Sequence, residues 1–196
     1  AVAGAASKPP AAPFASLAQR IAADQGKAIR LVSAGLDDVP GDYRKALRDI
    51  VTQLVRNAVV HGIEDAETRR ALKKDETGLL TVEFKRSDAG CELVFQDDGA
   101  GIVAERIRET AVARGVIGAE EAKALDSKTV LALIFRSGFS THGDSDRDAG
   151  RGVGLDLVRR LVQSLGGRIS VATSPGKYTR FRVLLPAEQA RRDAVA

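Results

Sequence analysis

A long amphipathic segment between Pro40 and Gly62 restricts the fold more than any other feature of the sequence. Its apolar residues recur at the spacing of a helix that buries one side: Tyr43, Leu47, Ile50, Leu54 and Ala58. Gly62 is a typical helix stop. Gln53, Asn57 and His61 follow at intervals of four, which places two amides and an imidazole on one face. We therefore predict a helix that buries its apolar side and presents a polar stripe to something polar.

The remaining segments alternate only loosely between helix and strand. Helices are expected in residues 14–21, 102–113, 120–134 and 151–165, and strands in 29–32, 79–85, 91–96, 168–173 and 179–185. Residues 64–77 form a polar, charged segment with helical character. Ser87-Asp88-Ala89-Gly90 joins two of these strands and predicts a hairpin. Because strands and helices do not alternate strictly, the pattern favours an α+β two-layer sandwich over a doubly wound parallel sheet.

Two glycine-rich segments predict a close approach of the backbone to a ligand. DDGAG at 97–101 follows a predicted strand, and GRGVG at 150–154 opens a predicted helix, where backbone N–H groups and the helix dipole favour phosphate. Leu155 or Leu157 stands where a G-x-G-x-x-G fingerprint needs its third glycine, and neither Gly-Lys pair precedes Ser or Thr as in a phosphate-binding loop. By itself, Asp-Asp-Gly is also an ordinary turn.

Six segments in order carry a resemblance: LVRNAVVHGIE (54–64), DDGAGI (97–102), LIFRSGFST (133–141), GRGVGLDLV (150–158), SLGGRISV (164–171) and SPGKYTRFRVLLP (174–186). Together they resemble the GHKL ATPases, and within them the CheA-like chemotaxis sensor histidine kinases. The resemblance implies a Bergerat-type fold over residues 14–186, with helices on one face of a mixed, largely antiparallel sheet. It also implies ATP and Mg²⁺ as ligands. Residues 1–13 are interpreted as a flexible linker and 187–196 as a charged tail.

The resemblance assigns roles to the matching residues of the polar stripe. Asn57 matches the family's magnesium ligand, and magnesium takes few oxygen ligands from protein. Arg56 and His61 match residues near the phosphates. Four residues before Asn57, most histidine kinases carry Glu and the chemotaxis branch carries His, but this chain has Gln53. In addition, Val60 stands where the branch often has an acid before His-Gly. An amide can orient a group by hydrogen bonds but cannot accept a proton, so Gln53 is expected to slow catalysis without abolishing it.

The glycine-rich segments receive their roles in the same way. Asp97 matches the carboxylate that binds the adenine amino group, Gly99 and Gly101 leave room for the base, and Thr179 matches a second adenine contact. Asp98 is the less suitable partner. Residues 135–150 form the expected ATP lid, with Phe135 and Phe139 resembling the phenylalanine box of histidine kinases. The candidate phosphate contacts are Ser140, Thr141, Gly150, Arg151, Gly152, Val153 and Gly154, although Arg151 is equally compatible with an ordinary surface position.

Three functions are consistent with these residues. The first is the catalytic domain of a CheA-like kinase that passes the γ-phosphoryl group of Mg-ATP to a histidine on a separate phosphoacceptor domain, in the same or a partner chain. A response regulator would act downstream, and a coupling protein and a receptor are further candidate partners. The second is a regulatory module that binds ATP with little or no turnover, and the presence of Gln53 is consistent with this function. The third is a GHKL clamp related to gyrase, MutL or the heat-shock chaperones, which the G-F-S-T run and the polar insertion after residue 64 disfavour.

Composition narrows the classes further. The net charge is +4, with 30 basic residues dispersed among 26 acidic ones, and such a mixture argues against nucleic-acid binding. Cys91, the single cysteine, has no partner for a disulfide or a metal site. We find no long apolar run and no signal-peptide pattern, so we expect a cytoplasmic domain without direct membrane insertion.

Overall fold

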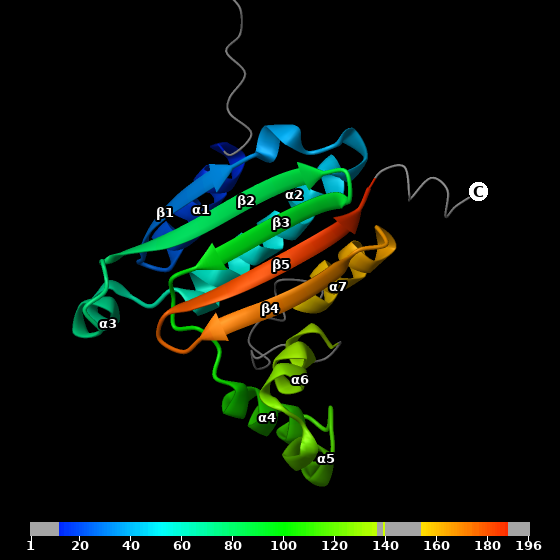
Figure 1. Ribbon diagram of the computed structural model, residues 1–196. Helices are drawn as coiled ribbons and strands as arrows, with labels where there is room; N and C mark the ends of the chain where they lie inside the picture. The colour runs from blue at the N-terminus through cyan, green and yellow to red at the C-terminus, as the bar shows by residue number, and fades with distance from the viewer. Residues whose placement is uncertain (1–11, 137–138, 140–153, 188–196) are drawn as a thin grey trace, which may run out of the picture.

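A five-stranded mixed sheet forms one layer of the computed structural model, which describes residues 12–136, 139 and 154–187 (Figure 1). In spatial order the strands are β1 (Ala28–Ala34), β2 (Thr77–Ser87), β3 (Gly90–Asp97), β5 (Tyr178–Pro186) and β4 (Arg168–Ser174). Only the β1–β2 pair is parallel, and the other three pairs are antiparallel. The predicted α+β fold, the hairpin and the largely antiparallel sheet are therefore confirmed.

Three helices cover one face of this sheet: α1 (Ala12–Asp24), α2 (Gly41–Asn57) and α7 (Leu155–Ser164) (Figure 1). Strand residues alternate accordingly. Leu93 and Phe95 of β3 and Phe181 and Val183 of β5 are buried beneath the helices. The opposite face carries charged and polar side chains, among them Arg182, which pairs with Glu92. This alternation is typical of an antiparallel sheet with one solvated face.

A group of short helices lies beside the edge strand β4 (Figure 1): α4 (Ala104–Ala113), α5 (Ala119–Ala124), α6 (Ser127–Ala132) and the 3₁₀ turn η3 (Leu133–Phe135). The prediction of one continuous helix over 120–134 was wrong. Backbone dihedrals become extended at Leu125 and Asp126, and the Asp126 carboxylate then caps α6 by accepting from Thr129 N at 2.7 Å. The cap starts a new helix because it satisfies one of the N–H groups that a helix start leaves free.

Helix α2 also ends differently from the prediction. Regular helix stops at Asn57, and η2 (Ala58–Gly62) is a π-helical turn closed by Ile63 N donating to Ala58 O at 2.7 Å. Lys27 supports this turn from the α1–β1 connection, since its Nζ donates to the carbonyls of Val59 at 2.8 Å and Val60 at 3.0 Å. Irregular turns of this kind recur at functional sites. The short helix α3 (Ala66–Ala71) follows this turn. A 3₁₀ turn, η1 (Leu36–Asp38), precedes α2.

No helix within the described ranges combines the length and the apolar character that crossing a membrane requires.

Replacing Lys27 with Met should lower the free energy of unfolding by about 1–3 kcal/mol, the usual net contribution of hydrogen bonds that involve a charged group. The change removes both donors to the η2 carbonyls and keeps the apolar stem. Urea denaturation of the two proteins measures the difference. Lys45→Met, at an exposed position of α2, is the matched control and should leave stability nearly unchanged. Equal losses in both variants would contradict a supporting role for Lys27.

Candidate functional site

Asp97 lies at the end of β3, directly opposite Thr179 on β5. Both residues are buried, with 2% and 5% of their surface exposed. Asp97 Oδ1 accepts a hydrogen bond from Gly99 N at 3.0 Å, and among the described residues no cation pairs with this carboxylate. Burial raises the pKa of Asp97 to about 7, opposed by hydrogen bonds from the Gly99 and Thr179 backbones and reinforced by the negative charges of Asp98 and Glu64. The site therefore contains a buried carboxylate with spare acceptor capacity, poised near neutral pH.

The end of α2 is brought against this carboxylate by the π-helical turn. A Cβ added to Gly62 would lie 3.3 Å from Asp97 Oδ1. A Cβ added to Gly99 would lie 2.0 Å from the carbonyl oxygen of Gly62, and this oxygen already accepts from Ala100 N at 2.8 Å. Glycine at 99 is thus required by the contact between the two segments, and the contact holds the end of the helix next to the end of β3.

Gly101 is constrained by a different neighbour. Its φ is +67°, and a Cβ there would lie 2.5 Å from the carbonyl oxygen of Ser174 in the β4–β5 turn. Gly176 N, in the same turn, donates to Ala100 O at 2.7 Å. Close packing of the turn therefore gives a structural reason for this glycine. Its predicted role of leaving room for a base stays a prediction.

The polar stripe of α2 divides into two parts. Gln53 and Asn57 are half-buried in the regular helix, while Arg56 and His61 are exposed. Because His61 belongs to the π-helical turn, which holds more residues per turn, it does not repeat the angular position of Asn57 as four-residue spacing in a regular helix would. In the described part of the chain, Gln53 Oε1 is the buried side-chain atom without a hydrogen-bond partner. An unsatisfied buried acceptor is costly, so this oxygen marks a place for a ligand or a water.

The predicted phosphate side of the site is only partly described. Ser140, Thr141, Gly150, Arg151, Gly152 and Val153 lie outside the described residues. Gly154 is the residue immediately before α7, at the position of its N-cap. Phe135 and Phe139 are buried, and the Phe135 ring meets Phe181 edge to face at 6.1 Å between centroids. No group of three or more metal-binding side chains of the His, Cys, Asp and Glu types occurs within the described ranges.

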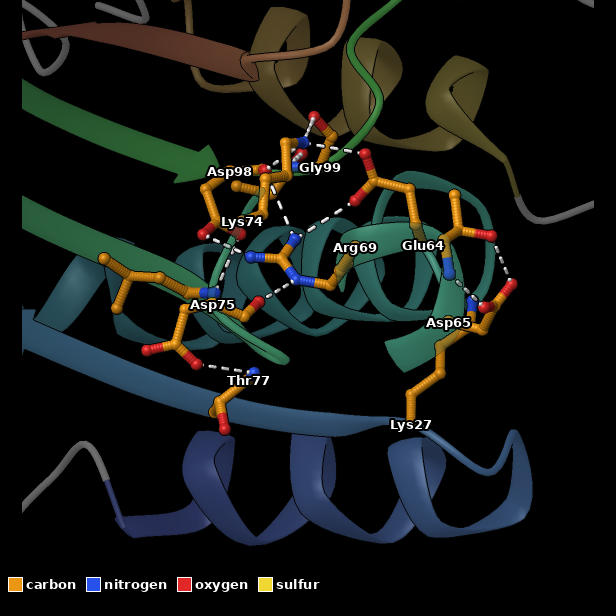
Figure 2. A network of polar contacts seen from close by, with 12 residues as sticks. Lys27, Glu64, Asp65, Arg69, Lys74, Asp75, Thr77, Asp98 and Gly99 are labelled. Carbon is orange, nitrogen blue, oxygen red and sulfur yellow. Dashed lines mark hydrogen bonds and ion pairs between the residues drawn. The ribbon is translucent and has the colours of Figure 1, made fainter. Parts of the chain in front are cut away.

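An ion-pair cluster next to the site was not anticipated from the sequence (Figure 2). Arg69 of α3 is fully buried, and its guanidinium contacts Glu64 Oε2 at 3.1 Å and Asp98 Oδ2 at 2.8 Å. Lys74 Nζ contacts Glu64 Oε1 at 2.7 Å. Segment 64–77 was predicted only as a polar, charged stretch with helical character. Its mixed acids and bases are typical of a solvated helix face, so the pattern carried no signal that one arginine would be buried.

A pocket of about 620 Å³ lies beside the first turns of α7. Its walls include four arginines and one carboxylate: Arg114, Arg136, Arg159, Arg160 and Asp156. Phe135 and Arg136, at the start of the predicted lid, line it, while Asp97, Thr179 and the polar stripe of α2 do not. The pocket therefore lies apart from Asp97. Its arginines outnumber its one carboxylate, so it carries a net positive charge beside α7, the helix at whose start the phosphates are expected.

The chain is similar to several known proteins. Residues 42–189 match the family described as histidine kinase-, DNA gyrase B- and HSP90-like ATPase. The chemotaxis protein CheA of Cereibacter sphaeroides is 40% identical over 161 residues, which are 82% of this chain and 23% of that protein. The gliding motility regulatory protein of Myxococcus xanthus is 34% identical over 174 residues, 88% of this chain and 22% of that protein. The chain therefore spans less than a quarter of the length of these two relatives.

A solved structure supports the fold. The histidine kinase domain of a blue-light activated histidine kinase from Erythrobacter litoralis superposes with a TM-score of 0.52 at 20% sequence identity. The match covers 98% of this chain and 69% of that one.

The raised pKa of Asp97 predicts a pH-dependent effect of Asp97→Asn on stability. The folded protein binds the Asp97 proton more tightly than the unfolded chain, whose carboxyl has a pKa near 3.8. The stability that this proton contributes is complete below about pH 4 and is lost as the pH rises through about 7. The neutral amide has no such loss, so the variant should be more stable than the wild type at pH 8. Urea titrations should show the difference shrinking steadily towards pH 4, and a difference independent of pH would refute the assigned pKa.

Proposed function

The chain belongs to the histidine kinase-, DNA gyrase B- and HSP90-like ATPase family, and from this membership we propose that it is the ATP-binding catalytic domain of a CheA-like histidine kinase. In this proposal it transfers the γ-phosphoryl group of Mg-ATP to a histidine on a separate phosphoacceptor domain. The similarity to CheA of Cereibacter sphaeroides along most of the chain supports this branch of the family.

The observation that carries the proposal is the environment of Asp97. The exocyclic amino group of adenine is a hydrogen-bond donor, and a buried carboxylate without a cation partner is a strong acceptor for it. Asp97 keeps one oxygen engaged with Gly99 N and has Thr179 beside it on β5. Asp98 does not offer the same capacity, because its two oxygens accept from Leu79 N and from Arg69. We therefore assign adenine recognition to Asp97, with Thr179 as the second contact.

The polar stripe of α2 would hold the phosphate end. Asn57 is the proposed magnesium ligand, and Arg56 and His61 are proposed to lie near the phosphates, as is the backbone of Gly154 at the start of α7. Magnesium, when bound, neutralises charge on the phosphate oxygens. The residues fit a bound Mg-ATP, because the half-buried surface of α2 includes Gln53 Oε1, an acceptor without a hydrogen-bond partner among the described residues. Gln53 can orient a group there by hydrogen bonds but cannot take a proton from it.

The phosphoacceptor would lie outside this sequence. Its two histidines are His61, which we assign to the nucleotide site, and His142. We propose that the acceptor domain belongs to the same protein or to a partner chain, with a response regulator downstream and a coupling protein and receptor upstream. The chain covers only 22–23% of the two relatives described above, which leaves ample length for such domains in proteins of that kind.

A second candidate function is a nucleotide-binding regulatory module with little or no turnover. Gln53 favours it, because an amide stands where the family places an acid or an imidazole and because this amide's oxygen has no hydrogen-bond partner among the described residues. In that case ATP would act as a conformational ligand.

The affinity for ATP should fall about tenfold between pH 8 and pH 6, because a carboxyl with a pKa of about 7 becomes mostly protonated over this range and the neutral form is a weaker acceptor that also presents an O–H donor. Asp97→Asn should bind ATP weakly at both pH values. Isothermal titration calorimetry measures both proteins, and the comparison cancels the titration of the nucleotide's own phosphates. Equal ATP affinities of the variant and the wild type at pH 8 would contradict the assignment of Asp97 to the nucleotide site.

Transfer of label from γ-labelled ATP to the parent protein's phosphoacceptor domain tests the kinase function. We expect slow labelling with the natural sequence and faster labelling with Gln53→His, because the imidazole adds a proton acceptor. Labelling with the variant alone would identify a kinase disabled at this residue. If neither protein transfers label while both bind ATP, the regulatory function replaces the kinase function.

A further inference from the structure

The turn that follows β3 is bonded to cations at two consecutive carbonyls. Lys74 Nζ donates to Asp98 O at 2.9 Å and to Gly99 O at 2.8 Å (Figure 2). Arg69 Nη1 lies 3.4 Å from the same Asp98 oxygen. Both cations come from the segment between η2 and β2, so this short segment contacts the turn directly.

Glu64 and Asp98 hold these cations in place. Each carboxylate oxygen of Glu64 accepts from a different cation, Oε2 from Arg69 and Oε1 from Lys74. Arg69 is further fixed by its Nε, which donates to Asp75 O at 2.5 Å. Two positive and two negative charges thus balance in a region where Arg69 has no exposed surface. Buried ion pairs contribute little net stability because desolvation opposes the Coulomb attraction, so the clearer effect of such a cluster is to fix geometry.

The geometry that it fixes is that of Asp97. The turn supplies the Gly99 N–H that donates to Asp97 Oδ1, and the next residue, Ala100, donates to Gly62 O. A shift of the Asp98 and Gly99 carbonyls would therefore move both the donor that orients Asp97 and the contact that holds the end of α2. Neither Lys74 nor Arg69 is bonded to Asp97 itself.

We propose that Lys74 and Arg69, joined through Glu64, are positioning residues that hold the Asp98–Gly99 turn so that the Asp97 carboxylate faces the adenine base. The inference rests on the proposed function, because it takes ATP as the ligand of Asp97. It adds a role for the segment between η2 and β2, which otherwise serves only to connect them.

The cluster also sets the charge around Asp97. The anions that face it are Glu64 and Asp98, and both raise its pKa, while Arg69 and Lys74 pair with these anions. Removing a cation leaves more of the negative charge of Glu64 and Asp98 acting on Asp97, which should raise the pH midpoint of nucleotide binding. Removing the negative charge of Glu64 should move the midpoint downwards. General loosening of the fold does not produce shifts of opposite sign.

The test compares the wild type with Lys74→Met and with the matched control Lys73→Met, an exposed lysine one residue away. Calorimetric titrations with ATP and with adenosine, over a series of pH values, give the affinity and its midpoint. We expect Lys74→Met to weaken both ligands by a similar factor of about ten, because the defect lies at the base and not at the phosphates. Its midpoint should rise, while Lys73→Met should match the wild type and Lys74→Arg should recover most of the affinity.

Two further measurements keep the inference testable if Lys74→Met folds poorly. Glu64→Gln removes the negative charge and keeps one of the two acceptor oxygens, so it should lower the midpoint. Amide hydrogen exchange should show faster exchange at Gly99 and Ala100 in any variant that weakens the cluster, by a larger factor than the accompanying loss of global stability produces at other core amides. A folded Lys74→Met protein with wild-type affinity and midpoint overturns the positioning role alone. Failure of the wild type to bind ATP or adenosine overturns the proposed function, and the positioning role with it.

Discussion

The contact between Gly62 and the turn after β3 is the constraint on which the site depends. The Gly62 carbonyl accepts from Ala100 N and leaves no space for a side chain at Gly99. This single approach joins the end of the core helix to the end of a central strand. Without it the polar stripe of α2 and the buried Asp97 would have no fixed relation, and each would be an ordinary feature of its own element.

Much of the fold could be predicted because local patterns and packing agree. The apolar spacing of α2 identified its buried side correctly, β3 and β5 formed where strand runs were predicted, and the hairpin between β2 and β3 followed from its turn residues. The errors occur where a local interaction outweighs the average pattern. The Asp126 carboxylate caps a new helix inside a stretch that is composed of helix-forming residues throughout. The π-helical turn replaces regular helix at Ala58–Gly62, although the helical spacing of apolar residues continues as far as Ala58.

The site could be predicted in its parts more than in its arrangement. Asp97 and Thr179 were both predicted as adenine contacts, and the structure places them opposite each other on β3 and β5, a pairing that depends on strand order that the sequence does not reveal. Arg69 could not be recognised, because burying a guanidinium is favourable only when several separate groups converge on it, here Glu64, Asp98 and the Asp75 carbonyl. Such convergence is a property of tertiary structure and leaves no periodic trace in the chain.

The position of β5 has a consequence for the order in which the domain can assemble. This strand is the last one among the described residues, yet it lies inside the sheet between β3 and β4. During synthesis the earlier strands β1, β2 and β3 can pair while β5 is still missing, which leaves the β3 edge open to other chains until the final segment emerges. Thr179 reaches its position opposite Asp97 only at that moment, so a nascent domain lacks part of the proposed nucleotide site until β5 has paired with β3.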